Sequence, residues 1–190
     1  MRREEILKIM EDAFAKKGNF LETVIEATVH ITEEIASRVA RPLISEMQWS
    51  LLVGAIRAEP KLFQALSLGR SPHGEVVFPP LELLEICEVA KRGVTFILDN
   101  YEDTSSAFKD MWPKDTLVRN AGTITAEYEA MVQELSTAET FTLPQKRVNE
   151  LVDALVLMEI GLLKGAVFSL YTSEVSDALK TIRESLPLFL

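Results

Sequence analysis

Glu159 is the residue whose chemistry conflicts most with its predicted surroundings. Residues 145–171 form the longest apolar stretch of the chain, and a helical period of about 100° per residue places Glu159 among the apolar side chains of that helix. A lone carboxylate in an apolar interior is costly unless it is paired, hydrogen-bonded or protonated. We therefore expect Glu159 to be mostly buried, with either a structural partner inside the protein or a bound ligand.

Ser45 and Gln48 are the other polar residues that fall on a predicted apolar face. Residues 42–58 have helical periodicity, and both side chains lie within the apolar arc of that helix. Arg57 lies on the polar side of the same helix, so Gln48 is the better candidate partner for Glu159. If the interior contains a pocket, these positions predict Glu159, Gln48 and Ser45 as its ligand-binding residues.

Metal binding has little support in this sequence. The chain has 2 histidines, and neither follows a glutamate by three positions as in the helical carboxylate-bridged metal proteins. His30 lies near Glu26 and Glu33, but helical angles place all three on a solvated face. A zinc site normally needs three or four converging ligands, so we predict no metal site and no cofactor.

Catalytic motifs are also lacking. Glu150 and Asp153, and then Glu174 and Asp177, have the spacing of magnesium-binding acids. An antiparallel pair of helices would separate the two pairs by roughly 25 Å at 1.5 Å per residue, which is too far for one site. The sequence contains no nucleophile elbow and no phosphate-binding glycine loop. We predict no catalytic residues.

Two further features carry nucleophilic or titratable groups. Cys87 is the only cysteine and lies on the apolar side of its predicted helix, which indicates a buried thiol. The longest irregular segment covers residues 69–79 and contains Arg70, Ser71, His73 and Glu75. The sequence leaves open whether this loop is a solvated connector or contacts an anion or a partner carboxylate.

Composition narrows the class of protein. The chain has 190 residues, of which 47% are hydrophobic, and a formal net charge of −9. Such a charge repels phosphate, so we expect neither nucleic acid nor anionic membrane surfaces as partners. Acidic residues interrupt both the N-terminal segment and the apolar stretch around Glu159, which argues against a signal peptide and a membrane span. We expect a cytoplasmic protein.

The elements that must position these residues are predicted to be helices. Glycine, proline and capping residues separate the periodic segments. We expect an all-α fold, a single domain over residues 1–190 with about seven to nine helices and a central apolar helix near residues 145–171. The predicted helices cover residues 3–17, 20–41, 42–58, 60–67, 80–100, 105–111, 115–136, 145–171 and 172–186, with one short strand at 76–78.

Apolar surface gives the strongest functional indication. The chain ends in Leu188, Phe189 and Leu190 after a proline, and Trp112 lies in a second apolar segment. Large apolar side chains at these positions indicate docking on the protein's own core or on a second subunit. We therefore predict a non-catalytic helical interaction or scaffold protein that is homo-oligomeric or bound to a protein partner. The alternatives are a ligand-binding or sensory bundle around Glu159 and, with least support, an enzyme without a recognisable motif.

Overall fold

The computed structural model is all-α, as predicted. It describes residues 1–16, 18–68, 74–134 and 140–190, with the side chains at positions 67 and 68 excluded. The elements form two compact units, which we call the terminal unit (Met1–Trp49 and Gly165–Leu190) and the inner unit (Ser50–Lys164). The single domain expected over residues 1–190 stays a prediction. No helix among the described segments combines the length and the apolar character needed to cross a membrane.

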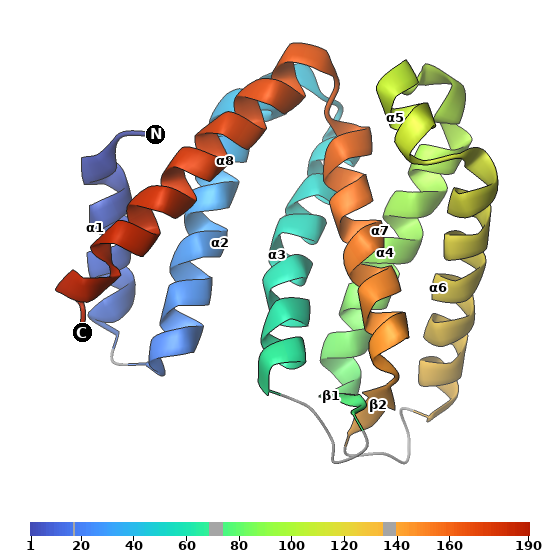
Figure 1. Ribbon diagram of the computed structural model, residues 1–190, viewed down its shortest axis with the longest axis horizontal. Coiled ribbons are helices and arrows are strands. Elements are labelled where there is room, and N and C mark those ends of the chain that lie inside the picture. Colours follow the sequence, from blue (N-terminus) through green and yellow to red (C-terminus); the bar gives the residue numbers. More distant parts are fainter. Residues whose placement is uncertain (17, 69–73, 135–139) are drawn as a thin grey trace. The chain divides into compact units, whose positions relative to one another are not determined.

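The terminal unit is built from three helices, each of which packs against the other two (Figure 1). They are α1 (Arg3–Phe14), α2 (Phe20–Val39) and α8 (Gly165–Ser185), with short 3-10 turns at Arg41–Leu43 and Leu186–Leu188. Their core is aliphatic, and its most buried side chains include Ile6, Met10, Ile31 and Ile35. This unit therefore brings the two ends of the chain into one small helical core.

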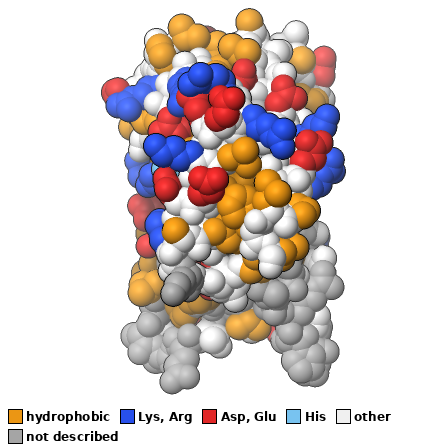
Figure 2. Space-filling view, turned by 90° about the vertical axis from the view of Figure 1, so that its left-hand side faces the viewer, with side chains coloured by type: hydrophobic (Ala, Val, Ile, Leu, Met, Phe, Trp, Pro, Cys, Tyr) orange, Lys and Arg blue, Asp and Glu red, His pale blue; other side chains and the backbone are white. Residues whose placement is uncertain are grey.

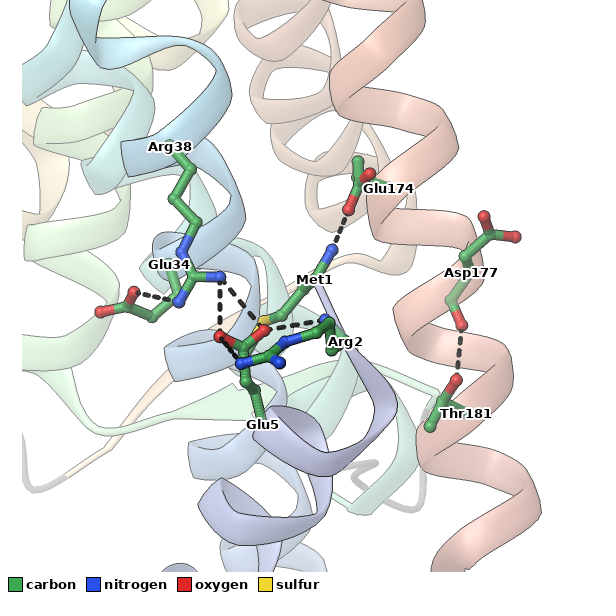
Figure 3. Close-up of polar contacts among 8 residues, drawn as sticks. All are labelled: Met1, Arg2, Glu5, Glu34, Arg38, Glu174, Asp177 and Thr181. Carbon is green, nitrogen blue, oxygen red and sulfur yellow. Dashed lines mark hydrogen bonds and ion pairs between the residues drawn. The ribbon is translucent and has the colours of Figure 1, made fainter.

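Polar contacts at one end of this unit tie its helices together (Figure 3). Arg38 of α2 donates to both carboxylate oxygens of Glu5 of α1 at 3.3 Å, and the amino group of Met1 forms an ion pair with Glu174 of α8. The backbone N–H of Arg2 also donates to Glu5, at 2.8 Å. That backbone bond and the Arg38 guanidinium lower the pKa of the Glu5 carboxyl. Glu5 is thus both a helix cap and a link between α1 and α2.

The inner unit is a helical bundle with a small two-stranded sheet at one end (Figure 1). Its elements are most of α3 (Glu46–Leu68), β1 (Val76–Phe78), α4 (Pro80–Asp99), a 3-10 turn at Tyr101–Asp103, α5 (Ser106–Met111), α6 (Lys114–Glu134), β2 (Phe141–Leu143) and α7 (Gln145–Leu162). α4 packs against both α6 and α7. The two strands are antiparallel, with Val77 opposite Thr142.

Two glycines allow α4 and α7 to approach closely. A Cβ on Gly93 of α4 would overlap the side chain of Met158, which is fully buried on α7. A Cβ on Gly161 of α7 would lie 2.8 Å from Ile97 of α4. Glycine has no side chain to separate two helices, so both positions reduce the distance between the helix axes. Met158 then fills the space that Gly93 leaves.

The observed boundaries differ most from the predicted ones in α3 and at the junction of α7 with α8, which begins at Gly165 and not at 172. The helices expected at 42–58 and 60–67 are one helix, α3, which contains Pro60. Buried side chains on both sides of this proline, Ile56 and Leu62, hold the helix together despite the missing N–H. The helix expected at 145–171 instead ends at Leu162, because Leu163 is extended and Gly165 has a φ of +55°.

The strand predicted at 76–78 is confirmed, whereas its partner Phe141–Leu143 was not predicted. Both strands have only 3 residues, and Val76, Phe78 and Leu143 are buried. Three residues give only a weak indication of a period of two, and the strand at Phe141–Leu143 was missed for this reason.

We predict that Gly93→Ala destabilises the protein, because the added methyl group meets buried Met158. Overpacking of this kind lowers the free energy of unfolding by about 1–3 kcal/mol. The better helix propensity of alanine raises it by at most about 1 kcal/mol, so the net effect is destabilising. The matched control is Gly122→Ala in α6, where the added group meets open space. Urea unfolding should show a lower free energy of unfolding for the first variant and an equal or higher one for the second. Equal effects of the two variants would contradict the close approach of α4 and α7.

Candidate functional site

Glu159 lies next to a second glutamate, Glu59. Glu159 belongs to α7 and Glu59 to α3, and both residues are half-buried within the inner unit. Glu159 was expected to be mostly buried with a hydrogen-bonding partner. In the described part of the chain its carboxyl group has no hydrogen bond or ion pair, and the charged group that acts on it is the Glu59 carboxylate. We call Glu59 and Glu159 the acid pair.

The surroundings of the acid pair favour its protonated form. Desolvation is the main cause that raises the pKa of Glu159 to about 8, and the neighbouring Glu59 carboxylate raises it further in the same direction. Desolvation also raises the pKa of Glu59. Two like charges in a poorly solvated place repel, so the pair holds a proton that isolated carboxyl groups would have lost at neutral pH.

The acid pair can take part in proton exchange and hydrogen bonding but does not form a metal site. No group of three or more His, Cys, Asp or Glu side chains capable of holding a metal ion occurs among the described residues. Two carboxyl groups without a third ligand can exchange protons or accept hydrogen bonds from one donor, which is less than a metal centre requires.

Ser45 and Gln48 have a structural role at the start of α3. The Ser45 hydroxyl accepts from the backbone N–H of Gln48 at 3.2 Å, and the Gln48 side chain accepts from the backbone N–H of Ser45 at 3.0 Å. This reciprocal arrangement is a capping box. Ser45 is exposed and Gln48 is half-buried, and both belong to the terminal unit, whereas Glu159 belongs to the inner unit. Their predicted role in ligand binding stays a prediction.

Trp112 lies at the corner where α5 meets α6. Its ring is half-buried, and its backbone carbonyl accepts from the Tyr101 hydroxyl at 3.0 Å. Lys109 and Lys114 each approach the Tyr101 ring to 5.7 Å, and Met111 beside Trp112 is exposed. This corner is stabilised by local contacts, and the interface role predicted for Trp112 stays a prediction.

The 69–79 loop lies partly outside the described residues. Arg70, Ser71 and His73 fall within that part, so their predicted anion contact has no structural description. Glu75 is described and half-buried.

Aromatic rings gather where α1, α2 and the last residues of the chain meet. Phe14 stacks on Phe189 with ring centroids 4.8 Å apart, and Phe14 also contacts Phe20 at 5.5 Å. Leu188 and Leu190 flank Phe189 and are 72% and 90% exposed. Phe189 therefore packs against Phe14 of α1, while its two leucine neighbours are exposed. We call Phe14, Phe20, Leu188, Phe189 and Leu190 the tail patch.

Charged side chains lie on one side of the face of the molecule that Figure 2 shows. Figure 2 looks onto the side of Figure 1 where α1 and the end of α8 lie, and it shows hydrophobic side chains gathered in the middle of this face with charged side chains above them. The exposed charged residues at the end of α1, the start of α2 and the last turns of α8 are of both signs and include Glu11, Lys16, Glu22, Lys180, Arg183 and Glu184. An apolar centre with a charged rim is the usual anatomy of a protein interface.

Sequence reasoning missed Glu59 and the ring contacts of Phe14 and Phe20. Glu59 directly precedes Pro60 and lies between two predicted helices. Helical periodicity therefore did not assign it to a buried or an exposed helix face. Phe14 and Phe20 stand on either side of the turn at Gly18 and Asn19. Two large rings flanking a tight turn between helices are a signal that could have predicted their contact.

No protein-family model, curated protein or solved structure matches this chain. The function therefore has to be argued from the acid pair and the tail patch.

We predict that Glu159 makes the protein less stable as the pH rises. The pKa of Glu159 is 4.5 as an ordinary carboxyl and about 8 in the folded chain. Between these pH values the folded state binds more protons than the unfolded state, so the free energy of unfolding falls as the pH rises, and the contribution of this proton is lost as the pH passes through 8. The variant Glu159→Gln keeps the size and shape of the side chain but cannot ionise. Urea unfolding at about pH 5, 7 and 9 should show a smaller loss of stability in this variant than in the wild type. The exposed control Glu129→Gln should keep the wild-type slope, and equal slopes for all three chains would rule out this role of Glu159.

We also predict that the Cys87 thiol is unreactive in the folded protein. The predicted burial of Cys87 is confirmed, and desolvation together with the Glu127 carboxylate raises its pKa to about 12. The thiolate is the reactive form, so little of it exists at neutral pH. Labelling with a thiol-specific disulfide reagent should be at least about a hundredfold slower in buffer than in denaturant. Equal labelling rates in the two conditions would show that α4 does not bury this residue.

Proposed function

We propose that the protein is a non-catalytic helical interaction protein that self-associates through the tail patch. The observation that carries this proposal is the exposure of Leu188 and Leu190 beside the stacked rings of Phe14 and Phe189. Apolar patches with a polar rim on a protein surface commonly mark interaction sites.

The stacked rings connect the last residues of the chain to α1. Phe189 stacks on Phe14, and Phe14 contacts Phe20, so the segment that carries both leucines already contacts α1 in the free chain. Little conformational entropy is then lost on binding. Full burial of a leucine side chain contributes about 1.5–3 kcal/mol, and Leu188 and Leu190 would both gain most of that burial only in a complex.

A second copy of the chain is the partner that we propose for this surface. The end of α1, the start of α2 and the last turns of α8 carry exposed charged residues of both signs. A surface with both signs can be complementary to itself, whereas a partner of uniform charge would be repelled by one part of the rim. The apolar centre is matched equally well by its own copy.

A ligand-binding bundle around Glu159 is the second candidate, and the acid pair is the observation in its favour. Two half-buried carboxyl groups with raised pKa values could accept a hydrogen bond from a donor on a ligand or bind a positive group of that ligand. We give the tail patch preference, because two carboxyl groups alone are fewer polar groups than a ligand site normally uses to orient its ligand.

We predict that replacing both exposed leucines, Leu188→Ser with Leu190→Ser, weakens self-association. The change removes apolar area from the patch and leaves the Phe14–Phe189 stack in place. Sedimentation velocity over a range of micromolar concentrations should show an oligomer for the wild type. The dissociation constant of the double variant should be at least about tenfold higher, because each copy loses two anchors.

The matched control is Leu81→Ser with Val118→Ser, two exposed apolar residues of the inner unit. This variant should associate like the wild type, and thermal unfolding should confirm that both variants are folded. A wild-type chain that stays monomeric, or an equal effect of the control, would end the proposal.

A further inference from the structure

We propose that the groove between α3 and α4 binds a small organic carboxylate, whose apolar body lies on the floor of the groove and whose charged group meets a basic rim. The groove has a volume of about 290 Å³ and lies within the inner unit. It is a different place from the acid pair, because neither Glu59 nor Glu159 lines it. This site goes beyond self-association through the tail patch and does not depend on it.

Contacts between the two helices limit the length of the groove. α3 runs toward the end of the bundle that carries the small sheet, and α4 runs away from it (Figure 1). A Cβ on Gly54 of α3 would lie 3.0 Å from the Val89 side chain of α4, so the helices touch at this level. Nearer to the sheet, the Lys61 ammonium pairs with the Glu85 carboxylate across the groove at 3.6 Å. A groove of this size suits a small molecule and not a protein segment.

The floor of the groove is apolar. Ala58 and Ile86 line it and are buried, and Gly54 and Val89 line it and are half-buried. These side chains offer no hydrogen bond to a ligand, so contact with them favours a hydrocarbon body.

The rim of the groove carries more positive than negative charge. Its charged side chains are the basic groups of Arg57, Lys61 and Arg92 and the acidic groups of Glu85 and Glu88. Lys61 and Glu85 neutralise each other in their ion pair. Two arginines and one glutamate remain, which is a surplus of one positive charge in a chain whose net charge is −9. The rim therefore favours an anion over a cation.

Arg92 is the rim residue best placed to hold that anion. Its side chain and that of Glu88 are exposed, and neither forms an ion pair in the described part of the chain. The planar guanidinium of an arginine matches the two oxygens of a carboxylate. A surplus of one positive charge fits a carboxylate, whereas a phosphate monoester carries close to two negative charges and is repelled more strongly by Glu88.

Titration of the ¹⁵N-labelled protein with hexanoate, followed by NMR chemical shifts, tests this site. Saturable shifts should concentrate at residues 54–61 and 85–92. The dissociation constant should lie in the millimolar range, because the ligand is small and the rim is exposed, so such a ligand is lost on purification. Acetate has the carboxylate without the chain, and hexylammonium has the chain with a positive charge. Both should bind more weakly than hexanoate.

Two exposed rim residues of α4 allow a test in which the expected effects have opposite signs. Arg92→Gln should raise the dissociation constant of hexanoate at least about fivefold, because a charge-assisted hydrogen bond to the carboxylate is lost. Glu88→Gln should lower that constant, because the repulsion between two carboxylates is removed. The matched control Arg183→Gln removes the same charge at an exposed position of the terminal unit and should leave the constant unchanged. The spectra also show whether each variant is folded.

The outcomes separate this inference from the proposed function. A lack of saturable shifts at the groove, equal binding of hexanoate and hexylammonium, or equal effects of Arg92→Gln and Arg183→Gln would overturn the site. Acetate binding as tightly as hexanoate would also overturn it, because the apolar floor would then contribute nothing. The variant Leu188→Ser with Leu190→Ser should bind hexanoate like the wild type, so loss of self-association leaves this test intact.

Discussion

The close contact of α4 with α7 is the constraint on which the inner unit depends. Met158 occupies the space over Gly93, and Gly161 lies against Ile97, so α7 has one rotational setting on α4. Residue 159 then projects about 100° away from residue 158, out of the α4 contact. This is the side on which Glu59 of α3 lies. The unusual position of Glu159 thus follows from the packing of its neighbour.

The terminal unit is held together by a small core with polar contacts at one end and aromatic contacts at the other. Its three helices share a small aliphatic core, and ion pairs such as Arg38 with Glu5 link them at one end. At the other end the aromatic rings of Phe14, Phe20 and Phe189 close the core. A core of this size cannot cover every apolar side chain, and Leu188 and Leu190 stay in water. The same arrangement that holds Phe189 leaves its neighbours available to a partner.

Local sequence patterns predicted the all-α class, the buried Cys87 and the short strand at 76–78, because each depends on composition or periodicity. The continuity of α3 through Pro60 and the end of α7 at Leu162 depend on tertiary packing and on a positive φ at Gly165, which periodicity does not encode. The odd placement of Glu159 was visible in the sequence, but its neighbour Glu59 was not. Glu59 and Glu159 are far apart in the sequence, and only the tertiary structure brings them together.

Native mass spectrometry of the purified chain tests the central claim most directly, since it reports subunit number and retained ligand in one spectrum. An interaction protein that associates through the tail patch should appear as a dimer whose mass is twice that of the chain, without additional mass. A monomer that carries a stoichiometric extra mass would contradict this account and would favour a ligand at the acid pair.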